Sequence, residues 1–341
     1  MDFEGLNKTA RALVAEGRGI LAADESTGTI KKRFDTIGVE STEETRRAYR
    51  DLLFTTPDME KFISGVIMYD ETIRQSTADG VSFSKHLADM DVIPGIKVDK
   101  GAKPLAGHPD EKVTEGLDGL RDRLKEYADL GAKFAKWRAV ITISDTIPSD
   151  ACISVNAHAL ARYAALCQEA GIVPIVEPEV LMNGAHGIDR CEAVTSATLK
   201  AVFNALTEQG VYLEGMLLKP NMVISGEDCP QQAGVEEVAA ATVRCLRRFV
   251  PAAVPGIVFL SGGQSAELAT EHLNAMHKLG PQPWALSFSY GRALQAPALD
   301  QWRGQEGNVT AAKQAFRHRA ECNSAATRGT YSSDMETQAA A

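Results

Sequence analysis

The stretch Gly19–Gly28 reads GILAADESTG, a short apolar run that leads into acidic and hydroxyl residues and a glycine. A run of this length without a polar residue inside it is typical of a strand buried on both faces, as in parallel sheets. The turn that follows, ADESTG, lacks the G-x-G-x-x-G pattern that often follows the first strand of an open nucleotide-binding sheet. This stretch therefore favours a closed barrel over an open doubly wound sheet.

Seven further apolar runs repeat this pattern, and amphipathic helical stretches lie between them. The runs are Ile63–Asp70, Ile93–Asp99, Ala132–Arg138, Ile172–Glu179, Leu213–Pro220, Gly256–Gly263 and Trp284–Gly291. Gly131, Gly171 and Gly210 follow three of the helical stretches, where a helix C-cap is expected. Eight strand–helix units in succession predict an α/β protein with one domain, a (β/α)8 TIM barrel. We expect the barrel and an N-terminal helix to span residues 1–316, and a mobile tail to follow over residues 317–341, where the periodicity is lost.

Composition excludes several classes of partner. The chain has 341 residues and a formal net charge of -9, without a long basic run, which is not typical of nucleic-acid binding. No apolar run approaches the roughly 18 residues that span a bilayer. The six cysteines form no C-x-x-C pair and are expected to be reduced, buried thiols. We therefore predict a cytoplasmic protein that binds neither nucleic acid nor membrane.

Metal chemistry finds little support in the histidines. None of the seven lies in a predicted strand, and no pair has ligand spacing such as H-E-x-x-H. We assign His158 and His272 to helix surfaces. The sequence thus predicts no metal site and no cofactor.

Charged residues recur where the predicted strands end, and in a (β/α)8 barrel the active site lies at the C-terminal ends of the strands. Taken alone, any one of them is most simply a solvated residue on the rim. Because they converge on one rim, they indicate a site. They are Asp24, Glu25, Lys97, Asp99, Lys136, Arg138, Glu177, Glu179 and Lys219.

Two of these lysines follow apolar residues directly. Lys219 comes after Met216–Leu218, and Lys136 lies between Ala135 and Trp137. A poorly hydrated lysine near other cations binds its proton less tightly, so that a pKa of ~10.4 falls toward neutrality. A neutral amine attacks a carbonyl carbon to form a Schiff base, and nearby carboxylates transfer the protons. The pattern therefore predicts carbonyl chemistry at a lysine.

Glycine-rich turns follow the seventh and eighth strands, which is the recurrent phosphate site of these barrels. The turns read SGGQS and SYGR, and ordinary glycine turns are the alternative explanation. Glycine lets backbone N–H groups approach an anion, and arginine binds phosphate through two hydrogen bonds. The candidate ligands are Ser261, Gly262, Gly263, Ser289, Gly291 and Arg292.

A second basic segment follows the first strand. Asp24–Phe34 reads DESTGTIKKRF and carries hydroxyls at Ser26, Thr27 and Thr29 before the cations. The cations are Lys31, Lys32 and Arg33. By itself the segment is most simply a helix start followed by solvated charges, but opposite the first anion site it suits a substrate with two phosphates.

Taken together, seven motifs resemble the class I fructose-bisphosphate aldolase family. They are LAADESTG, GIKVDKG, FAKWR, IVPIVEPE, LEGMLLKPNM, FLSGGQS and FSYGRALQ, and the resemblance extends from about Gly17 to about Tyr331. It implies a metal-independent lyase that reversibly cleaves fructose 1,6-bisphosphate into dihydroxyacetone phosphate and glyceraldehyde 3-phosphate in glycolysis and gluconeogenesis. It also implies a homotetramer.

The resemblance implies a role for each matching residue. Lys219 matches the Schiff-base lysine and Glu177 the general acid and base. Asp24 and Lys136 match polar residues that assist carbinolamine formation and cleavage. The remaining assignments are Glu179 as a further catalytic candidate, Lys97 and Arg138 in the substrate site, Ser261, Gly262, Gly263, Ser289, Gly291 and Arg292 around the C1 phosphate, and Ser26, Thr29 and Arg33 at the other end of the substrate.

The chain departs from the family pattern at its end. Many eukaryotic members end in a tyrosine that helps to protonate the enamine, whereas this sequence ends in METQAAA. Either Tyr331, its last tyrosine, or water is expected to take that role.

Two other interpretations stay open on the residues alone. The first is a different Schiff-base barrel, such as a transaldolase or a deoxyribose-phosphate aldolase, which needs one phosphate site. The second is a catalytically silent scaffold, which has no need to retain Lys219, Glu177, Lys136 and Asp24 together.

Overall fold

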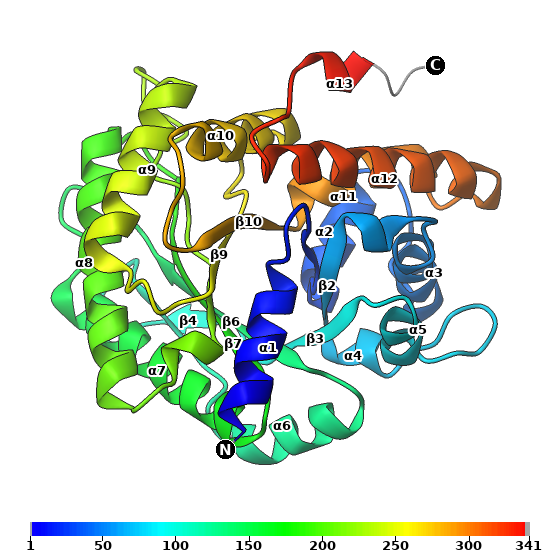
Figure 1. Cartoon of the computed structure of the whole chain (residues 1–341), viewed down its shortest axis with the longest axis horizontal. Helices are drawn as coiled ribbons and strands as arrows, with labels where there is room; N and C mark the ends of the chain where they lie inside the picture. The colour runs from blue at the N-terminus through cyan, green and yellow to red at the C-terminus, as the bar shows by residue number, and fades with distance from the viewer. Residues whose placement is uncertain (1, 338–341) are drawn as a thin grey trace.

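The computed structural model describes residues 2–337, and its centre is a closed barrel of eight parallel strands (Figure 1). Around the barrel the strands follow in the order β1, β2, β3, β6, β7, β8, β9, β10. Their bounds are β1 (Gly19–Ala23), β2 (Ile63–Met68), β3 (Ile93–Lys97), β6 (Phe134–Ile141), β7 (Val173–Val180), β8 (Leu217–Leu218), β9 (Gly256–Phe259) and β10 (Ala285–Tyr290). The predicted (β/α)8 barrel is therefore confirmed. Each predicted strand overlaps an observed one, and β6 and β7 extend beyond their predicted ends at Arg138 and Glu179.

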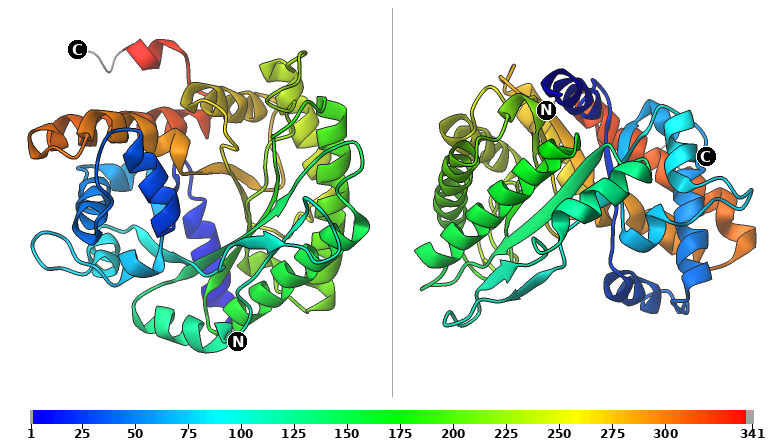
Figure 2. Two further views of the ribbon diagram at one scale, coloured as in Figure 1. Left: turned by 180° about the vertical axis from the view of Figure 1, so that it is seen from behind. Right: turned by 90° about the horizontal axis from the view of Figure 1, so that it is seen from below.

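Helices cover the outside of the barrel, as the two further views show (Figure 2). They are α2 (Thr27–Asp35), α3 (Glu43–Phe54), α4 (Asp70–Ile73), α5 (Phe83–Asp89), α6 (Leu120–Asp129), α7 (Asp150–Glu169), α8 (Ile188–Glu208), α9 (Val235–Phe249), α10 (Ala266–Lys278), α11 (Arg292–Trp302) and α12 (Val309–Ala326). The predicted glycine caps are confirmed, because Gly131, Gly171 and Gly210 follow α6, α7 and α8 with positive φ.

Helix α1 (Phe3–Leu13) seals one end of the barrel. Its buried residues Leu6, Ala10 and Leu13 pack with inward-facing strand residues such as Phe134 and Val258. Figure 1 shows this helix crossing the barrel in dark blue. Since this packing fills the N-terminal end, the space for a ligand lies at the opposite end, where the strands finish.

Strand β8 is shorter than predicted. Leu213–Gly215 form a 3₁₀ turn, η2, and the strand begins only at Leu217. The reason is a contact from α7, because Gln168 Nε2 donates to the carbonyl oxygens of Tyr212 and Gly215. Beyond the strand, the backbone N–H of Lys219 still donates to Val176 O at 2.8 Å, so Lys219 continues the sheet.

The sequence did not predict a two-stranded antiparallel hairpin, β4 (Ala102–Pro104) and β5 (Lys112–Thr114), which lies between β3 and β6 in the chain. Four of its six residues are exposed, so it carries no buried apolar run. Thr114 Oγ1 donates to Arg138 O at 2.8 Å, which fastens the hairpin to β6.

The predicted tail boundary at Arg317 is wrong. Helix α12 continues to Ala326, and a short helix, α13 (Asp334–Thr337), follows. Small and polar residues replace apolar ones in this part of α12 because they pack closely and bond to neighbours: Ser324 Oγ donates to Gly17 O at 2.6 Å. Tyr331 exchanges hydrogen bonds with Asn274 of α10. Residues 338–341 of the predicted tail lie outside the described residues.

Within residues 2–337, no helix combines the length and the apolar character that a membrane crossing requires.

Candidate active site

A cavity of about 620 Å³ opens at the C-terminal ends of the barrel strands. It brings together thirteen of the sixteen predicted site residues: Asp24, Ser26, Thr29, Arg33, Lys97, Lys136, Arg138, Glu177, Lys219, Ser261, Ser289, Gly291 and Arg292. Glu179 instead binds Arg138 at the border of the cavity. Gly262 and Gly263 form the turn directly after Ser261 and do not line it.

Strand register explains why the charged side chains meet. Lys97 of β3 pairs with Lys136 of β6, and Arg138 pairs with Glu177 of β7. Since side chains alternate along a strand, Lys136 and Arg138 point to the same side. The register therefore places three cations and a carboxylate on the inner surface of adjacent strands.

The floor of the cavity is a row of alternating charges. Lys219 Nζ lies 3.2 Å from Glu177 Oε1, and Lys136 Nζ lies 3.3 Å from Glu177 Oε2. Lys136 Nζ also lies 2.7 Å from Asp24 Oδ2. The side chains of Lys136, Glu177 and Lys219 are at most 5 % exposed, so these contacts are screened weakly by solvent.

These contacts fix two charge states. Burial by itself would raise the pKa of Asp24, but the nearby Lys136 and Lys219 outweigh it and hold that pKa well below its ordinary value. Burial would likewise lower the pKa of Lys136, but Asp24, Glu177 and Asp99 raise it well above its ordinary value. Asp24 is therefore a carboxylate and Lys136 an ammonium at neutral pH.

Two further ion pairs border this row. Lys97 Nζ donates to Asp99 Oδ1 at 2.6 Å and to the Asp99 carbonyl at 2.9 Å. Arg138 Nε donates to Glu179 Oε2. The pairs keep both cations at the cavity wall, where they can meet an anionic substrate.

The first helix after β1 presents a basic, hydroxyl-bearing side of the cavity. Ser26 is the N-cap of α2, and its Oγ lies 3.1 Å from Thr29 Oγ1. A helix N-terminus favours anions, because its first N–H groups have no partner within the helix. Of the three predicted cations, Lys32 and Arg33 line the cavity, whereas Lys31 pairs with Asp35 on the surface.

Glu25 lines the cavity and makes contacts that the sequence did not predict. Its carboxylate accepts from Arg33 at 2.5 Å, from buried Arg50 at 2.6 Å and from Gln295 of α11 at 2.9 Å. Gln295 also donates to Ala22 O. Glu25 thus fixes Arg33 at the cavity wall. The signal in the sequence was its place, with Asp24, at the end of the first predicted strand.

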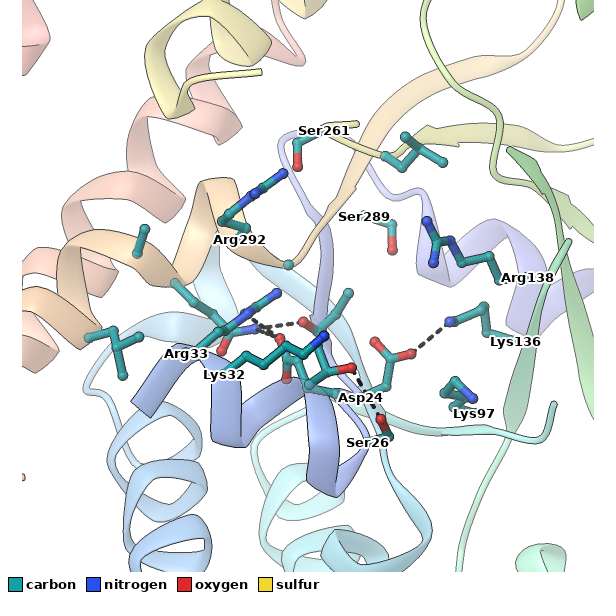
Figure 3. Close-up of a pocket in the computed structure, with 18 of the residues that line it drawn as sticks. Asp24, Ser26, Lys32, Arg33, Lys97, Lys136, Arg138, Ser261, Ser289 and Arg292 are labelled. Carbon is teal, nitrogen blue, oxygen red and sulfur yellow. Dashed lines mark hydrogen bonds and ion pairs between the residues drawn. The ribbon is translucent and has the colours of Figure 1, made fainter. Parts of the chain in front are cut away.

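The opposite side of the cavity is built from the turns after β9 and β10. Gly262 and Gly263 have φ of 54° and 86°, a region that favours glycine. A Cβ on Gly263 would lie 3.2 Å from Arg292 Nη2, so the arginine packs against this turn. In Figure 3, Ser261 and Arg292 lie at the top of the view, and Ser26 and Lys97 lie at the bottom. Ser289 Oγ is buried without a hydrogen-bond partner in the described part of the chain and is free to meet a ligand.

A comparison with known proteins agrees with this geometry. The family model described as fructose-bisphosphate aldolase class-I matches residues 5–341. The chain belongs to the class I fructose-bisphosphate aldolases. It is therefore a lyase of the aldolase class that needs no metal ion, and family membership sets aside transaldolase and deoxyribose-phosphate aldolase.

Relatives of this aldolase are similar over almost their whole length. A protein of Xanthomonas campestris pv. campestris named probable fructose-bisphosphate aldolase class 1 is 62% identical over 330 residues, which cover 96% of this chain and 99% of the relative. The fructose-bisphosphate aldolase of Dictyostelium discoideum is 53% identical over 335 residues, covering 97% and 94%. A solved structure of the Plasmodium falciparum aldolase, in complex with TRAP and a small-molecule inhibitor, superposes with a TM-score of 0.96 at 53% identity, covering 97% of this chain and 96% of that one.

Tyr331 does not reach the aldolase cavity. Its hydroxyl donates to Glu336 Oε1 at 2.7 Å, and burial together with that carboxylate raises its pKa. Tyr331 is also absent from the cavity lining. As the structure stands, it is not placed to protonate an enamine.

One of the two surface assignments for histidines is wrong. His158 is exposed as predicted, but His272 is only 3 % exposed and lies within α10. Within residues 2–337, one group of side chains, His318, Cys322 and Glu336, offers three ligand atoms within 4.8 Å of one another. Arg319 Nη1 already donates to both oxygens of that carboxylate, and none of the three residues lines the aldolase cavity.

Proposed function

We propose that this chain catalyses the reversible cleavage of fructose 1,6-bisphosphate into dihydroxyacetone phosphate and glyceraldehyde 3-phosphate through a Schiff base on Lys219. The observation that carries the proposal is the 3.2 Å contact between Lys219 Nζ and Glu177 Oε1 on the floor of the cavity. An amine and a carboxyl group at this distance can exchange the proton that Schiff-base formation requires.

Lys219 is better placed than its neighbour Lys136 to act as the nucleophile, because it contacts one carboxylate and Lys136 contacts two. Lys136 contacts two carboxylates, and its raised pKa keeps it an ammonium. A protonated amine has no free electron pair for a carbonyl carbon. We therefore assign Lys136 to charge stabilisation, where it holds Asp24 and Glu177 in place.

Two anion-binding sides of the cavity fit the two phosphates. Ser261, the glycine turn and Arg292 form one side, to which we assign the C1 phosphate. Ser26, Thr29 and Arg33, from the segment after β1, also line the cavity, and we assign them to the other end of the substrate. Ser26 lies below Ser261 and Arg292 in Figure 3. A silent scaffold would have no need of this arrangement.

Glu177 is placed to carry the protons of Schiff-base formation and of C–C cleavage. It takes a proton from Lys219, the freed electron pair of the amine attacks C2 of the ketose, and Glu177 returns the proton to the oxygen at C2. Glu177 then takes a second proton from the nitrogen and gives it to the carbinolamine hydroxyl, which leaves as water, so that a cationic imine and the Glu177 carboxylate remain. The same carboxylate takes the proton of the C4 hydroxyl while the C3–C4 bond breaks, so that the electron pair moves into an enamine and the aldehyde departs. Protonation of the enamine at C3 and hydrolysis release the second triose and restore Lys219.

Family similarity supports three wider parts of the proposal. We assign the enzyme to glycolysis and gluconeogenesis, to the cytoplasm and to a homotetramer, with sugar bisphosphates and triose phosphates as its small-molecule partners.

Borohydride trapping tests the proposal. Reduction in the presence of fructose 1,6-bisphosphate should attach triose mass to Lys219, and Lys219→Met should abolish both the adduct and cleavage. Lys85→Met, at an exposed lysine of α5 that pairs with Asp89, is the matched control and should leave both unchanged. Cleavage should persist with a metal chelator present. An adduct on another lysine, or full activity of the Lys219 variant, would refute the assignment.

A further inference from the structure

Behind the turn Ser261–Gly263 lies a buried pair of side chains that the reaction itself does not use. Gln264 is 8 % exposed and His272, on α10, is 3 % exposed. Neither lines the cavity. His272 Nδ1 lies 2.5 Å from Gln264 Oε1, so the two side chains are hydrogen-bonded.

The orientation of the Gln264 amide follows from its partners. Its nitrogen, Nε2, lies 2.9 Å from the carbonyl oxygen of Ser261, which can only accept a hydrogen bond. The amide oxygen therefore faces His272, and His272 Nδ1 must carry the hydrogen that is donated to it. Burial lowers the pKa of His272 to about 4, so at neutral pH the ring is uncharged and has one N–H to give.

The Ser261 carbonyl is held twice by the same residue. Besides the side-chain amide, the backbone N–H of Gln264 donates to it at 3.0 Å. In a trans peptide the C=O and the following N–H point in opposite directions. A Ser261 carbonyl turned toward Gln264 therefore turns the Gly262 N–H to the other side of the turn.

We propose that Gln264 and His272 are positioning residues: they fix the Ser261–Gly262 peptide plane so that the Gly262 N–H faces the C1 phosphate in the cavity. A series of hydrogen bonds links His272 on α10 through Gln264 to the Ser261 carbonyl of the phosphate turn. Arg292 packs against Gly263, the next glycine of that turn. This inference rests on the proposed function, because it needs a phosphate at this turn.

A matched pair of variants separates positioning from packing. In His272→Asn the side-chain amide can place a donor where Nδ1 lies, whereas His272→Leu has a similar size and no donor. The readout is borohydride trapping of two ketones, dihydroxyacetone phosphate and dihydroxyacetone, which differ only in the phosphate.

For His272→Leu we expect the half-saturating concentration of dihydroxyacetone phosphate to rise about tenfold, the effect of one lost hydrogen bond. Trapping at saturation, and trapping of dihydroxyacetone, should stay as in the wild type. His272→Asn should restore binding of the phosphorylated ketone. Equal losses for both ketones, no loss, or an Asn variant as weak as the Leu variant would overturn the inference.

Gln264→Met keeps the experiment decisive if His272→Leu does not fold. It should raise the half-saturating concentration of dihydroxyacetone phosphate and leave trapping of dihydroxyacetone unchanged. In the double variant Gln264→Met/His272→Leu this concentration should rise no further than in either single variant, because both residues act through one carbonyl. Additive losses would overturn the proposal. If the wild-type enzyme traps neither ketone, the proposed function fails. If it traps both and the variants do not discriminate between them, only this inference fails.

Discussion

Lys136 Nζ lies 2.7 Å from Asp24 Oδ2, and this ion pair joins the interior of strand β6 to the end of strand β1 across the barrel. The two strands are not neighbours, because β2 and β3 lie between them. Side chains that meet in this way must both point inward. The pair therefore forms a fixed floor on which Glu177 and Lys219 are held.

Asp24→Asn should reduce cleavage with little effect on folding. The amide keeps the shape of Asp24 but removes one of the two carboxylates that hold Lys136. We expect kcat to fall about 10²- to 10⁴-fold, the range for a lost proton-transfer or charge-positioning group. A coupled assay for triose production measures it. The control is Asp35→Asn, which affects an exposed pair with Lys31 and should leave kcat unchanged. If the Asp24 variant has the same kcat as this control, the role of Asp24 is contradicted.

The two ends of the substrate should respond to different variants. Arg292→Ala should raise KM about 10- to 100-fold for both fructose 1,6-bisphosphate and fructose 1-phosphate, because it removes charge-assisted hydrogen bonds to the phosphate both share. The double variant Ser26→Ala/Thr29→Ala should raise KM for the bisphosphate alone. Steady-state kinetics with both sugars measures the difference, and the opposite pattern would show that the phosphates bind in the reverse orientation.

Glu25→Gln should destabilise the fold as well as the site. Arg50 is 2 % exposed and donates to Glu25 at 2.6 Å, so the variant leaves a buried cation without its counter-charge. Breaking one side of a buried ion pair costs about 3–5 kcal/mol of unfolding free energy. Denaturant unfolding measures this loss. Glu44→Gln, which affects an exposed pair with Arg47, should cost under about 1 kcal/mol, and equal losses in both variants would count against the network around Glu25.

Acid should weaken the fold through His272. Burial lowers its pKa from 6.5 to about 4, so between these values the unfolded chain binds a proton that the folded chain does not. The free energy of unfolding therefore falls as the pH falls from about 6.5 toward 4, by up to roughly 3 kcal/mol for one such site. Denaturant unfolding at pH 7 and pH 5 should show a smaller drop for His272→Asn than for the wild type. Exposed His158→Asn should behave as the wild type, and an unchanged drop in the His272 variant would exclude this source.

Most of the barrel could be predicted because its strands are buried on both faces. The five residues of β1 and the eight of β7 are all buried, and such runs stand out against amphipathic helices. The start of β8 could not be predicted, since it depends on Gln168, which lies 44 residues from Tyr212 along the chain. The hairpin of β4 and β5 was missed because it is exposed and leaves no apolar signal.

The reacting groups were predictable for the same physical reason. A charge at the end of an apolar strand, such as Lys219 or Glu177, contrasts with its neighbours. The residues that position them do not contrast in this way. Glu25 depends on Gln295, 270 residues away, and His272 looked like a polar residue on an amphipathic helix. Their roles arise from contacts between elements that are distant in the chain.

Helix α1 carries a consequence for the order of assembly. Asn7 Nδ2 donates to Glu214 O at 2.7 Å across 207 residues of chain. The helix is synthesised before the barrel strands, so its apolar side has no partner until those strands are made. Contacts of such long range are slow to form. Helix α1 is therefore expected to dock late in folding onto the N-terminal end of the barrel.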